Sequence, residues 1–121
     1  MSLSDRLSSI LNELRAALPD IRGALISSAD GMLIASNVTT GDSNRMAAMV
    51  ATSLGLGKRM CESFGAGNLS ETSVSGDGGQ VYIYGAGSKG VLAIINPAGG
   101  NIGLLHLECR AAARKVAEVL G

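Results

Sequence analysis

The chain is short and electrically balanced, because its 121 residues carry ten basic and ten acidic side chains. Zero net charge removes the basic surface by which proteins bind nucleic acid or anionic membranes, so neither is expected as a partner. With two tyrosines, one phenylalanine and no tryptophan, the chain has too few rings to stack on single-stranded nucleic acid, and its core must be aliphatic.

The length and the cysteines bound the class of protein. A chain of this size is expected to fold as one domain over residues 1–121. Cys61 and Cys109 form no C-x-x-C pair, and the sequence has no histidine cluster, so we expect two buried thiols rather than a zinc site or a disulfide framework. The N-terminus lacks the basic region of a signal peptide, and we expect a cytoplasmic protein.

The first third of the chain predicts a helix followed by a hairpin. The helix is expected to begin with Ser4 as its N-cap and to stop at Pro19, because apolar residues recur at helical spacing between them. Two short apolar runs, residues 22–28 and 32–36, then flank Asp30-Gly31. An Asp-Gly pair in this setting is a strong hairpin signal, so we expect a strand, a tight turn built around Asp30, and a second strand.

The middle of the chain predicts a long helix and three further strands. Ser43 is expected to cap the helix, which runs to about Phe64, where glycines follow. Residues 68–75 are predicted as a mostly polar strand, and residues 80–84 and 91–95 as two apolar strands separated by a glycine-rich turn. The last of these is apolar on both faces and is expected at the centre of the sheet, covered on both sides.

A final helix is predicted from about Asn101, with apolar residues at steps of three and four. The resulting order, α-β-β-α-β-β-β-α, predicts an α/β sandwich. In it, a five-stranded and largely antiparallel sheet carries helices on both faces.

Two features that could suggest chemistry are better explained by structure. The glycines at 85, 87 and 90 match the dinucleotide-binding fingerprint as a string, but a strand rather than a helix is expected to follow, so we predict a hairpin turn. His106, the single histidine, is expected at the rim of the last helix. No nucleophile, paired acids or metal-ligand set accompanies it, so we expect no catalysis, cofactor or metal.

The middle helix has more apolar surface than one sheet contact requires. At about 100° per residue, its apolar side chains cover about half of the circumference. Two flanks of this arc could meet the same helix of a second copy: Met49, Leu56 and Met60, or Ala47, Leu54 and Cys61. The alternative is that the first and last helices cover the whole arc within one chain.

The polar strand at residues 68–75 adds a second argument for a dimer. It contributes little to a core and is predicted at the edge of the sheet, where an uncovered strand pairs readily with another chain. Helix beside helix and strand beside strand would form one two-fold homodimer contact. We predict that its residues are Ala47, Met49, Val50, Leu54, Leu56, Met60, Cys61, Leu69, Glu71 and Ser73.

The order of elements and two sequence stretches resemble the roadblock family of dynein light chains and their prokaryotic relatives. The stretches are the hairpin ALISSADGMLIA at residues 24–35 and GQVYIYGAGSKGVLAII at residues 79–95. The resemblance covers nearly the whole chain and implies a roadblock/profilin-like fold. It also implies dimerisation, with a second copy or with a paralogue, in which the middle helices lie side by side and the sheets join through the third strand.

The resemblance further implies a partner. Prokaryotic roadblock domains commonly bind a small Ras-like GTPase, some as its activating protein, and the paired helices are the usual docking platform. Carried onto this chain, that platform would present Arg45, Ala48, Thr52, Arg59 and Glu62. We interpret the two arginines as contact residues, although an arginine that reaches the nucleotide can accelerate hydrolysis by roughly 10³ to 10⁵.

The sequence therefore predicts a non-enzymatic, homodimeric regulator or adaptor of a small GTPase. Two alternatives remain open at this point. One is a purely structural dimerisation module, which would have no nucleotide-dependent partner. The other is a small-molecule sensor, which would need a pocket between sheet and middle helix that the dense aliphatic pattern does not indicate.

Overall fold

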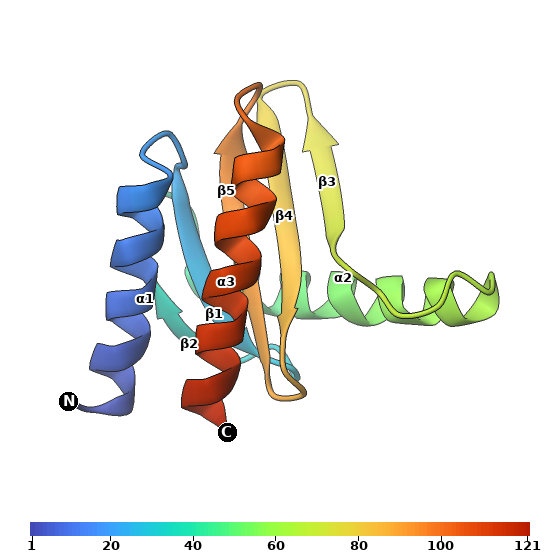
Figure 1. The fold of residues 1–121 in the computed structure, drawn as a ribbon, viewed down its shortest axis with the longest axis horizontal. Helices are drawn as coiled ribbons and strands as arrows, with labels where there is room; N and C mark the ends of the chain where they lie inside the picture. The colour runs from blue at the N-terminus through green and yellow to red at the C-terminus, as the bar shows by residue number, and fades with distance from the viewer.

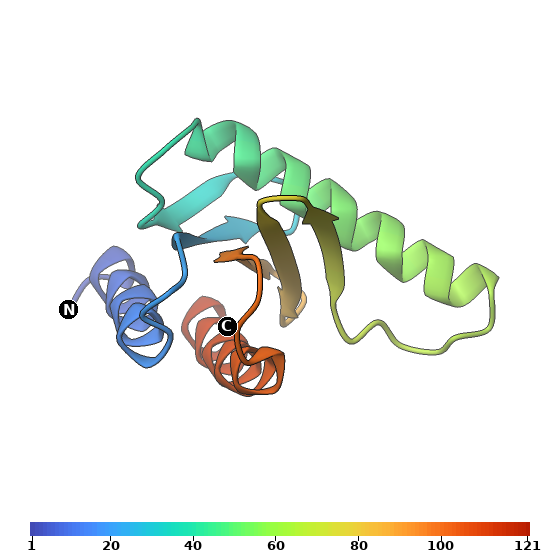
Figure 2. The same cartoon turned by 90° about the horizontal axis from the view of Figure 1, so that it is seen from above.

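The computed structural model describes residues 1–121 as a five-stranded antiparallel sheet with helices on both faces. The helices are α1 (Leu3–Ala17), α2 (Ser43–Ser63) and α3 (Ile102–Leu120). The strands are β1 (Gly23–Ser28), β2 (Leu33–Ser36), β3 (Thr72–Gly76), β4 (Gly79–Ala86) and β5 (Gly90–Pro97), in the spatial order β2-β1-β5-β4-β3. α1 and α3 cover one face side by side, and α2 crosses the other (Figure 1, Figure 2). The predicted α-β-β-α-β-β-β-α sandwich is confirmed.

The core is divided unequally by the sheet. A cluster of 19 buried residues lies between the sheet and the α1–α3 layer, whereas the cluster under α2 has 7. Central strand β5 contributes to both, because Leu92 and Ile94 face α1 and α3 while Val91 and Ala93 face α2. This confirms the prediction that β5 is covered on both sides. The small cluster under α2 also shows that this helix is the least enclosed of the three.

The helix starts are set by polar caps. Ser2, and not Ser4, caps α1 by accepting a hydrogen bond from the Asp5 N–H. The predicted cap at Ser43 is also wrong, because the Asp42 carboxylate accepts the N–H groups at the start of α2. An ionised oxygen is the better acceptor at the positive end of a helix dipole. Asn101, near which α3 was predicted to begin, is its cap, with Oδ1 accepting the Leu104 N–H at 3.0 Å.

The β1–β2 hairpin has a wider turn than the predicted tight one. Residues 29–32 connect the strands, and the ladder is irregular between Ile26 and Ser27. Within the turn, the Ser28 hydroxyl donates to the Asp30 carboxylate at 2.5 Å, and Gly31 adopts a φ of 93°. A Cβ at Gly31 would lie 3.2 Å from the Ala48 Cα. The turn therefore packs directly against α2.

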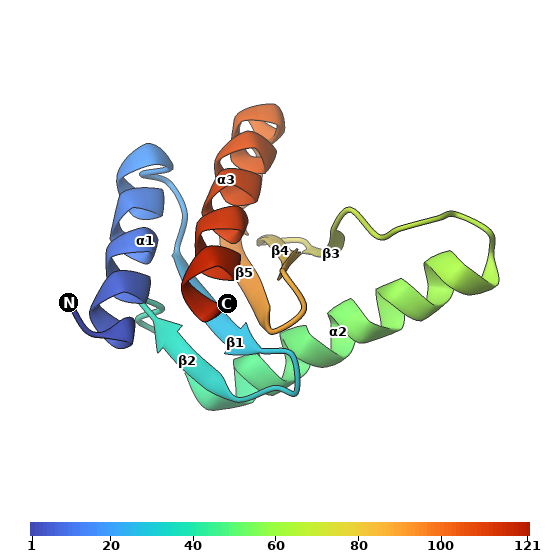
Figure 3. The same ribbon diagram turned by 60° about the horizontal axis from the view of Figure 1, so that its bottom comes forward.

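Two further findings concern composition rather than layout. No helix has the length and apolar content that crossing a bilayer would require. Both cysteines are free thiols, but only Cys109 is buried, since Cys61 is half-exposed. The expectation of two buried thiols is wrong for Cys61. This residue is in the last turn of α2, and the last turns of this helix project past the edge of the sheet (Figure 3).

Candidate interaction surface

Helix α2 extends well beyond the sheet that it crosses. Its first half packs over the strands, and its last turns project past β3, the edge strand (Figure 2, Figure 3). The crossing is close at Gly57, where a Cβ would lie 3.2 Å from the Leu69 side chain. Beyond Gly57, every side chain of the helix except the half-exposed Cys61 is exposed. Helices gain most of their stability from a buried face. The projecting end of α2 lacks such a face within the single chain.

Three of the predicted dimer residues face the interior of the chain itself. Ala47, Val50 and Leu54 are at most 6% exposed and pack in one cluster with Leu25 and Ile83 of the sheet. Their surface is used up within one chain, so they cannot contribute the contact predicted for them. Of the two flanks considered, the one with Ala47 and Leu54 is therefore the one that the sheet covers.

The other flank is open and apolar. Met49, Leu56, Met60 and Phe64 expose 61%, 52%, 50% and 79% of their surface, respectively. Steps of seven and four residues place these side chains on one stripe of α2. Val74 of β3 is also 58% exposed. Phe64 and Val74 were not among the predicted contact residues. The signal for them was an apolar side chain at the end of the middle helix and on the polar edge strand.

An apolar groove lies beside this stripe, between the first half of α2 and the sheet. Its volume is about 430 Å³. The helix contributes Met46, Met49, Val50 and Ser53, and the strands contribute mainly aliphatic side chains, including Val74, Val81, Ile83 and Ile95. The sequence did not predict this groove, because α2 crosses the sheet at an angle that leaves one corner uncovered, and a crossing angle is not encoded in local periodicity.

Strand β3 provides a free backbone edge next to the stripe. It pairs only with β4, over Thr72–Gly76, and is the last strand of the sheet. The strand is shorter than predicted, so Leu69 and Glu71 precede it, while the exposed Ser73 lies within it. Leu69 is held against Gly57 of α2, and Glu71 forms an ion pair with Arg110. Only Ser73 of these three predicted contact residues lies on the strand itself.

The predicted docking residues are all exposed on the outward side of α2. They are Arg45, Ala48, Thr52, Arg59 and Glu62. The molecule contains two salt bridges, and neither involves this set, so the charges are available to a partner. The turn at residues 29–32 abuts this surface at Ala48 and adds Met32, which is 67% exposed. Met32 was missed because only the packing of Gly31 on α2 brings it there.

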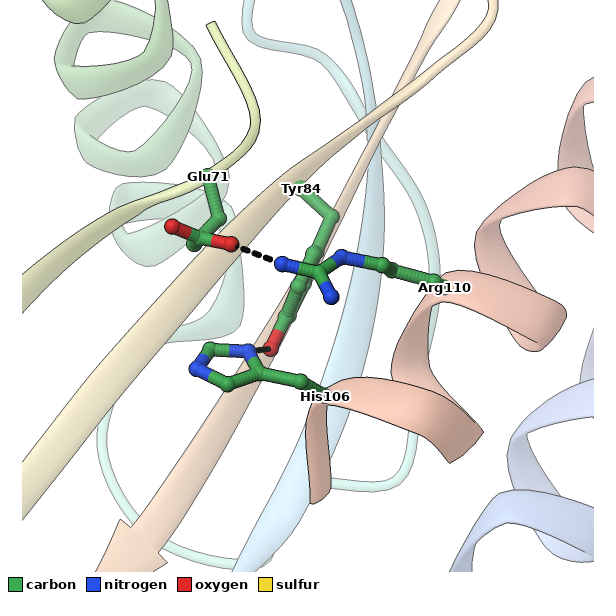
Figure 4. A network of polar contacts seen from close by, with 4 residues as sticks. All are labelled: Glu71, Tyr84, His106 and Arg110. Atoms are coloured by element: carbon green, nitrogen blue, oxygen red, sulfur yellow. Dashed lines mark hydrogen bonds and ion pairs between the residues drawn. The ribbon is translucent and has the colours of Figure 1, made fainter. Parts of the chain in front are cut away.

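The opposite face of the sheet holds a polar network (Figure 4). The Tyr84 hydroxyl lies 2.5 Å from Nδ1 of His106, and both tyrosine rings of β4 contact the imidazole edge-on. His106 is at the rim of α3 as predicted, but it is half-buried and partnered. Burial raises the pKa of Tyr84 far above its ordinary value, with Cys109 adding to the effect. The phenol therefore stays protonated and can donate to His106.

Burial also raises the pKa of the Cys109 thiol to about 12. A thiol with so high a pKa is a poor nucleophile at neutral pH. No group of three or more His, Cys, Asp or Glu side chains is arranged to hold a metal ion. The network is best explained as a set of contacts that hold α3 on β4, with the Arg110–Glu71 pair linking α3 to the segment before β3.

Comparison with known proteins identifies relatives of this arrangement. A sequence model of the Roadblock/LC7 domain matches residues 8–96. The uncharacterized protein MJ1340 of Methanocaldococcus jannaschii is 30% identical over 97 residues, which are 79% of this chain and 84% of that protein. The structure of the gliding protein mglB from Thermus thermophilus has a TM-score of 0.86 at 18% identity, covering 98% of this chain and 91% of the other.

A second solved structure agrees. The Roadblock/LC7 domain from Streptomyces avermitilis has a TM-score of 0.85 at 24% identity, covering 93% of this chain and 95% of the other. At these identities the structural matches show the fold. They confirm the roadblock/profilin-like layout inferred from the sequence.

Proposed function

The chain belongs to the Roadblock/LC7 domain family, and on this premise we propose that it is a cytoplasmic homodimer that docks a small Ras-like GTPase and regulates it without a chemical step of its own. The observation that carries the proposal is the position of three unsatisfied features on one side of the molecule. They are the open apolar stripe of α2, the groove beside it, and the free edge of β3.

These features are complementary to one another, which is what a two-fold contact requires. The end of α2 projects past β3, in the direction of a second copy joined at that edge (Figure 2). The exposed Met60 and the C-cap Phe64 follow Gly57 in this end of the helix. In the dimer that we propose, this end lies over the groove of the partner copy, while the two β3 edges pair. Each copy then covers the apolar surface that the other cannot cover by itself. A paralogue with the same features could replace the second copy.

Dimerisation would leave the outward side of the two α2 helices exposed as one surface. Arg45, Arg59 and Glu62 have no ion partner within the chain. Charges of this kind contribute to the specificity and the rate of protein association more than to its affinity. We assign Arg45 and Arg59 to contact with the GTPase. An activating role would follow if docking repositions catalytic groups that the GTPase itself supplies.

A second candidate function is favoured by the groove. If the chain were monomeric, the groove, with a volume of about 430 Å³ and an aliphatic lining, would suit a small apolar ligand. This sensor function and the dimer compete for the same surface, since the groove cannot hold both a ligand and the partner helix. The oligomeric state of the purified chain therefore distinguishes the two candidates.

The test of the proposed function is nucleotide-dependent capture. The purified chain is immobilised and incubated with native lysate containing either a non-hydrolysable GTP analogue or GDP, and bound proteins are identified by mass spectrometry. We expect a Ras-like GTPase in one nucleotide state only. Recovery of no GTPase, or of equal amounts in both states, would contradict the regulator and favour a purely structural dimer.

A further inference from the structure

A notch with two arginines opens beside β4, on the face of the sheet covered by α3. The pairing of β3 with β4 ends where Thr72 lies opposite Ile83, so Tyr84–Ala86 of β4 have β5 on one side and no strand on the other. Figure 1 shows this part of β4 extending beyond the start of β3. An unpaired strand edge offers backbone N–H and C=O groups to an extended chain.

The notch is a shaped cavity rather than a flat edge. Its volume is about 290 Å³, and its lining includes Ser70, Tyr84, Gly85, Arg110 and Arg114. The Cβ position of Gly85 points to the other face of the sheet, towards Leu54. On the α3 face the floor at this residue is therefore bare backbone, which an incoming strand can approach closely.

The two arginines on the wall of the notch differ in their partners. Arg110 forms an ion pair with Glu71 (Figure 4), whereas Arg114, one helical turn further along α3, takes part in neither of the two salt bridges of the molecule. Continuation of the β3–β4 register would place Glu71 opposite Tyr84. The chain thus already shows that a carboxylate at this strand position reaches an arginine of α3.

The same register explains why Arg114 has no acid. The next residue on that face, two positions before Glu71, is Leu69, which would lie opposite Ala86. Instead, the Leu69 side chain packs against Gly57 of α2, on the other side of the sheet. The segment before β3 turns away from β4 at this point, so it places no second acidic side chain beside Arg114.

We propose that this notch binds an extended acidic segment of a partner protein, which pairs with β4 at Gly85 and Ala86, past the position opposite Tyr84 that Glu71 takes, and places a carboxylate on Arg114. The spacing fits, because alternate residues of a strand are about 6.8 Å apart and residues one turn apart on a helix about 6 Å. α3 runs alongside β4 (Figure 1), and Glu71 already holds Arg110, so an acid of the segment one strand repeat past Glu71 faces Arg114. This surface is separate from the proposed GTPase platform and does not depend on it.

The test uses a fluorescently labelled short peptide of alternating Glu and Val, with binding followed by anisotropy at low salt. Two control peptides separate the contributions. A version with Gln in place of Glu keeps the alternating pattern but carries no carboxylates. A backbone N-methylated version keeps the acids but cannot pair as a strand.

We expect the alternating peptide to bind and both controls to bind far more weakly. Arg114→Glu should weaken binding by roughly tenfold or more, and Arg114→Gln should weaken it less. Arg6→Glu, an equal charge change at an exposed position of α1, should leave binding unchanged. Met49→Asp, the variant designed to disrupt the proposed dimer, should bind the alternating peptide as well as the parent chain does. Failure of the proposed dimer would therefore not affect this measurement.

Several outcomes would overturn the proposal. Absence of binding would do so directly. Equal binding of the Gln version would show that the carboxylates are not recognised. Equal losses in Arg114→Glu and Arg6→Glu would show general charge attraction. Displacement of the peptide by inorganic phosphate at matched ionic strength would indicate a small-anion site instead of strand addition.

Discussion

Gly57 and Leu69 are in direct contact, because a Cβ on the glycine would lie 3.2 Å from the leucine Cδ2. This contact sets how closely α2 crosses the segment that leads into β3. Gly55, two residues earlier, has no atom within 4 Å of its Cβ position. A side chain at position 57 would meet Leu69, whereas a side chain at position 55 would meet nothing. Substitution of each glycine by alanine can test this difference.

Gly55→Ala should raise the free energy of unfolding by up to about 1 kcal/mol, because alanine has the higher helix propensity. Gly57→Ala gains the same propensity but must displace Leu69, and overpacking costs about 1–3 kcal/mol. We expect Gly57→Ala to be no more stable than the parent chain. Urea unfolding followed by circular dichroism measures both. Equal stabilisation by the two substitutions would show that the Gly57 contact is soft.

Met49→Asp should produce a folded monomer, since Met49 is largely exposed within one chain and would be buried only in the proposed dimer. Leu54→Asp should instead prevent folding, because Leu54 is 4% exposed in the chain's own core and an unpaired buried carboxylate is costly. Light scattering gives the mass and circular dichroism the fold. Thr52→Glu, on the outward side of α2, is the matched control and should remain dimeric. A dimeric Met49→Asp would place the interface elsewhere.

Arg59→Glu should keep the dimer and weaken binding of the captured GTPase. The expected loss is about 1.5–3 kcal/mol for a charge-assisted hydrogen bond, which corresponds to roughly tenfold to a hundredfold in affinity. Surface plasmon resonance with the GTPase loaded with the favoured nucleotide measures this. Arg6→Glu on α1 makes the same charge change away from the platform. Similar losses in both variants would remove Arg59 from the docking surface.

The buried thiol predicts an alkaline loss of stability. Because folding raises the pKa of Cys109 from 9.0 to about 12, the native state retains a proton that the unfolded state releases between these values. Stability is therefore full below about pH 9 and falls as pH rises, by up to about 1.4 kcal/mol per pH unit for this group. The pKa of Tyr84 is raised as well and acts in the same direction.

Cys109→Ala should reduce that slope, measured as the change in urea midpoint from neutral to alkaline pH. Cys61→Ala is the control, because Cys61 is half-exposed. A thiol reagent at mildly alkaline pH should label Cys61 in the native protein and Cys109 only after unfolding. Rapid labelling of both in the native state would contradict the burial of Cys109.

Much of the fold could be predicted because its signals are local. The Asp-Gly turn, the glycine-rich turn before β5 and the helical stripes each span a few residues and need no knowledge of the rest of the chain. The errors in the caps at Ser2 and Asp42 are of the same local kind. They arose because two neighbouring polar residues could each serve as a cap.

The site was harder to predict because tertiary packing decides which of its residues are buried and which are exposed. Periodicity gave one apolar arc on α2, but the crossing of the helix over the sheet decides that Ala47 and Leu54 are buried while Met49 and Leu56 are exposed. The partner of His106 was missed for a similar reason, since Tyr84 is 22 residues away in the sequence. β3 begins only at Thr72, and Leu69 before it packs against Gly57 of α2, a contact that no local pattern indicates.

The overhanging end of α2 has a practical consequence. Its final backbone amides are held by the hydrogen bonds of the helix itself, and no strand or other helix lies beside them (Figure 3). Such turns fray easily, so their amide protons should exchange with solvent deuterium almost freely in an isolated copy and slowly once something rests against them. The exchange rates of the amide protons of residues 58–63 should therefore distinguish an isolated copy from one that is bound to a partner.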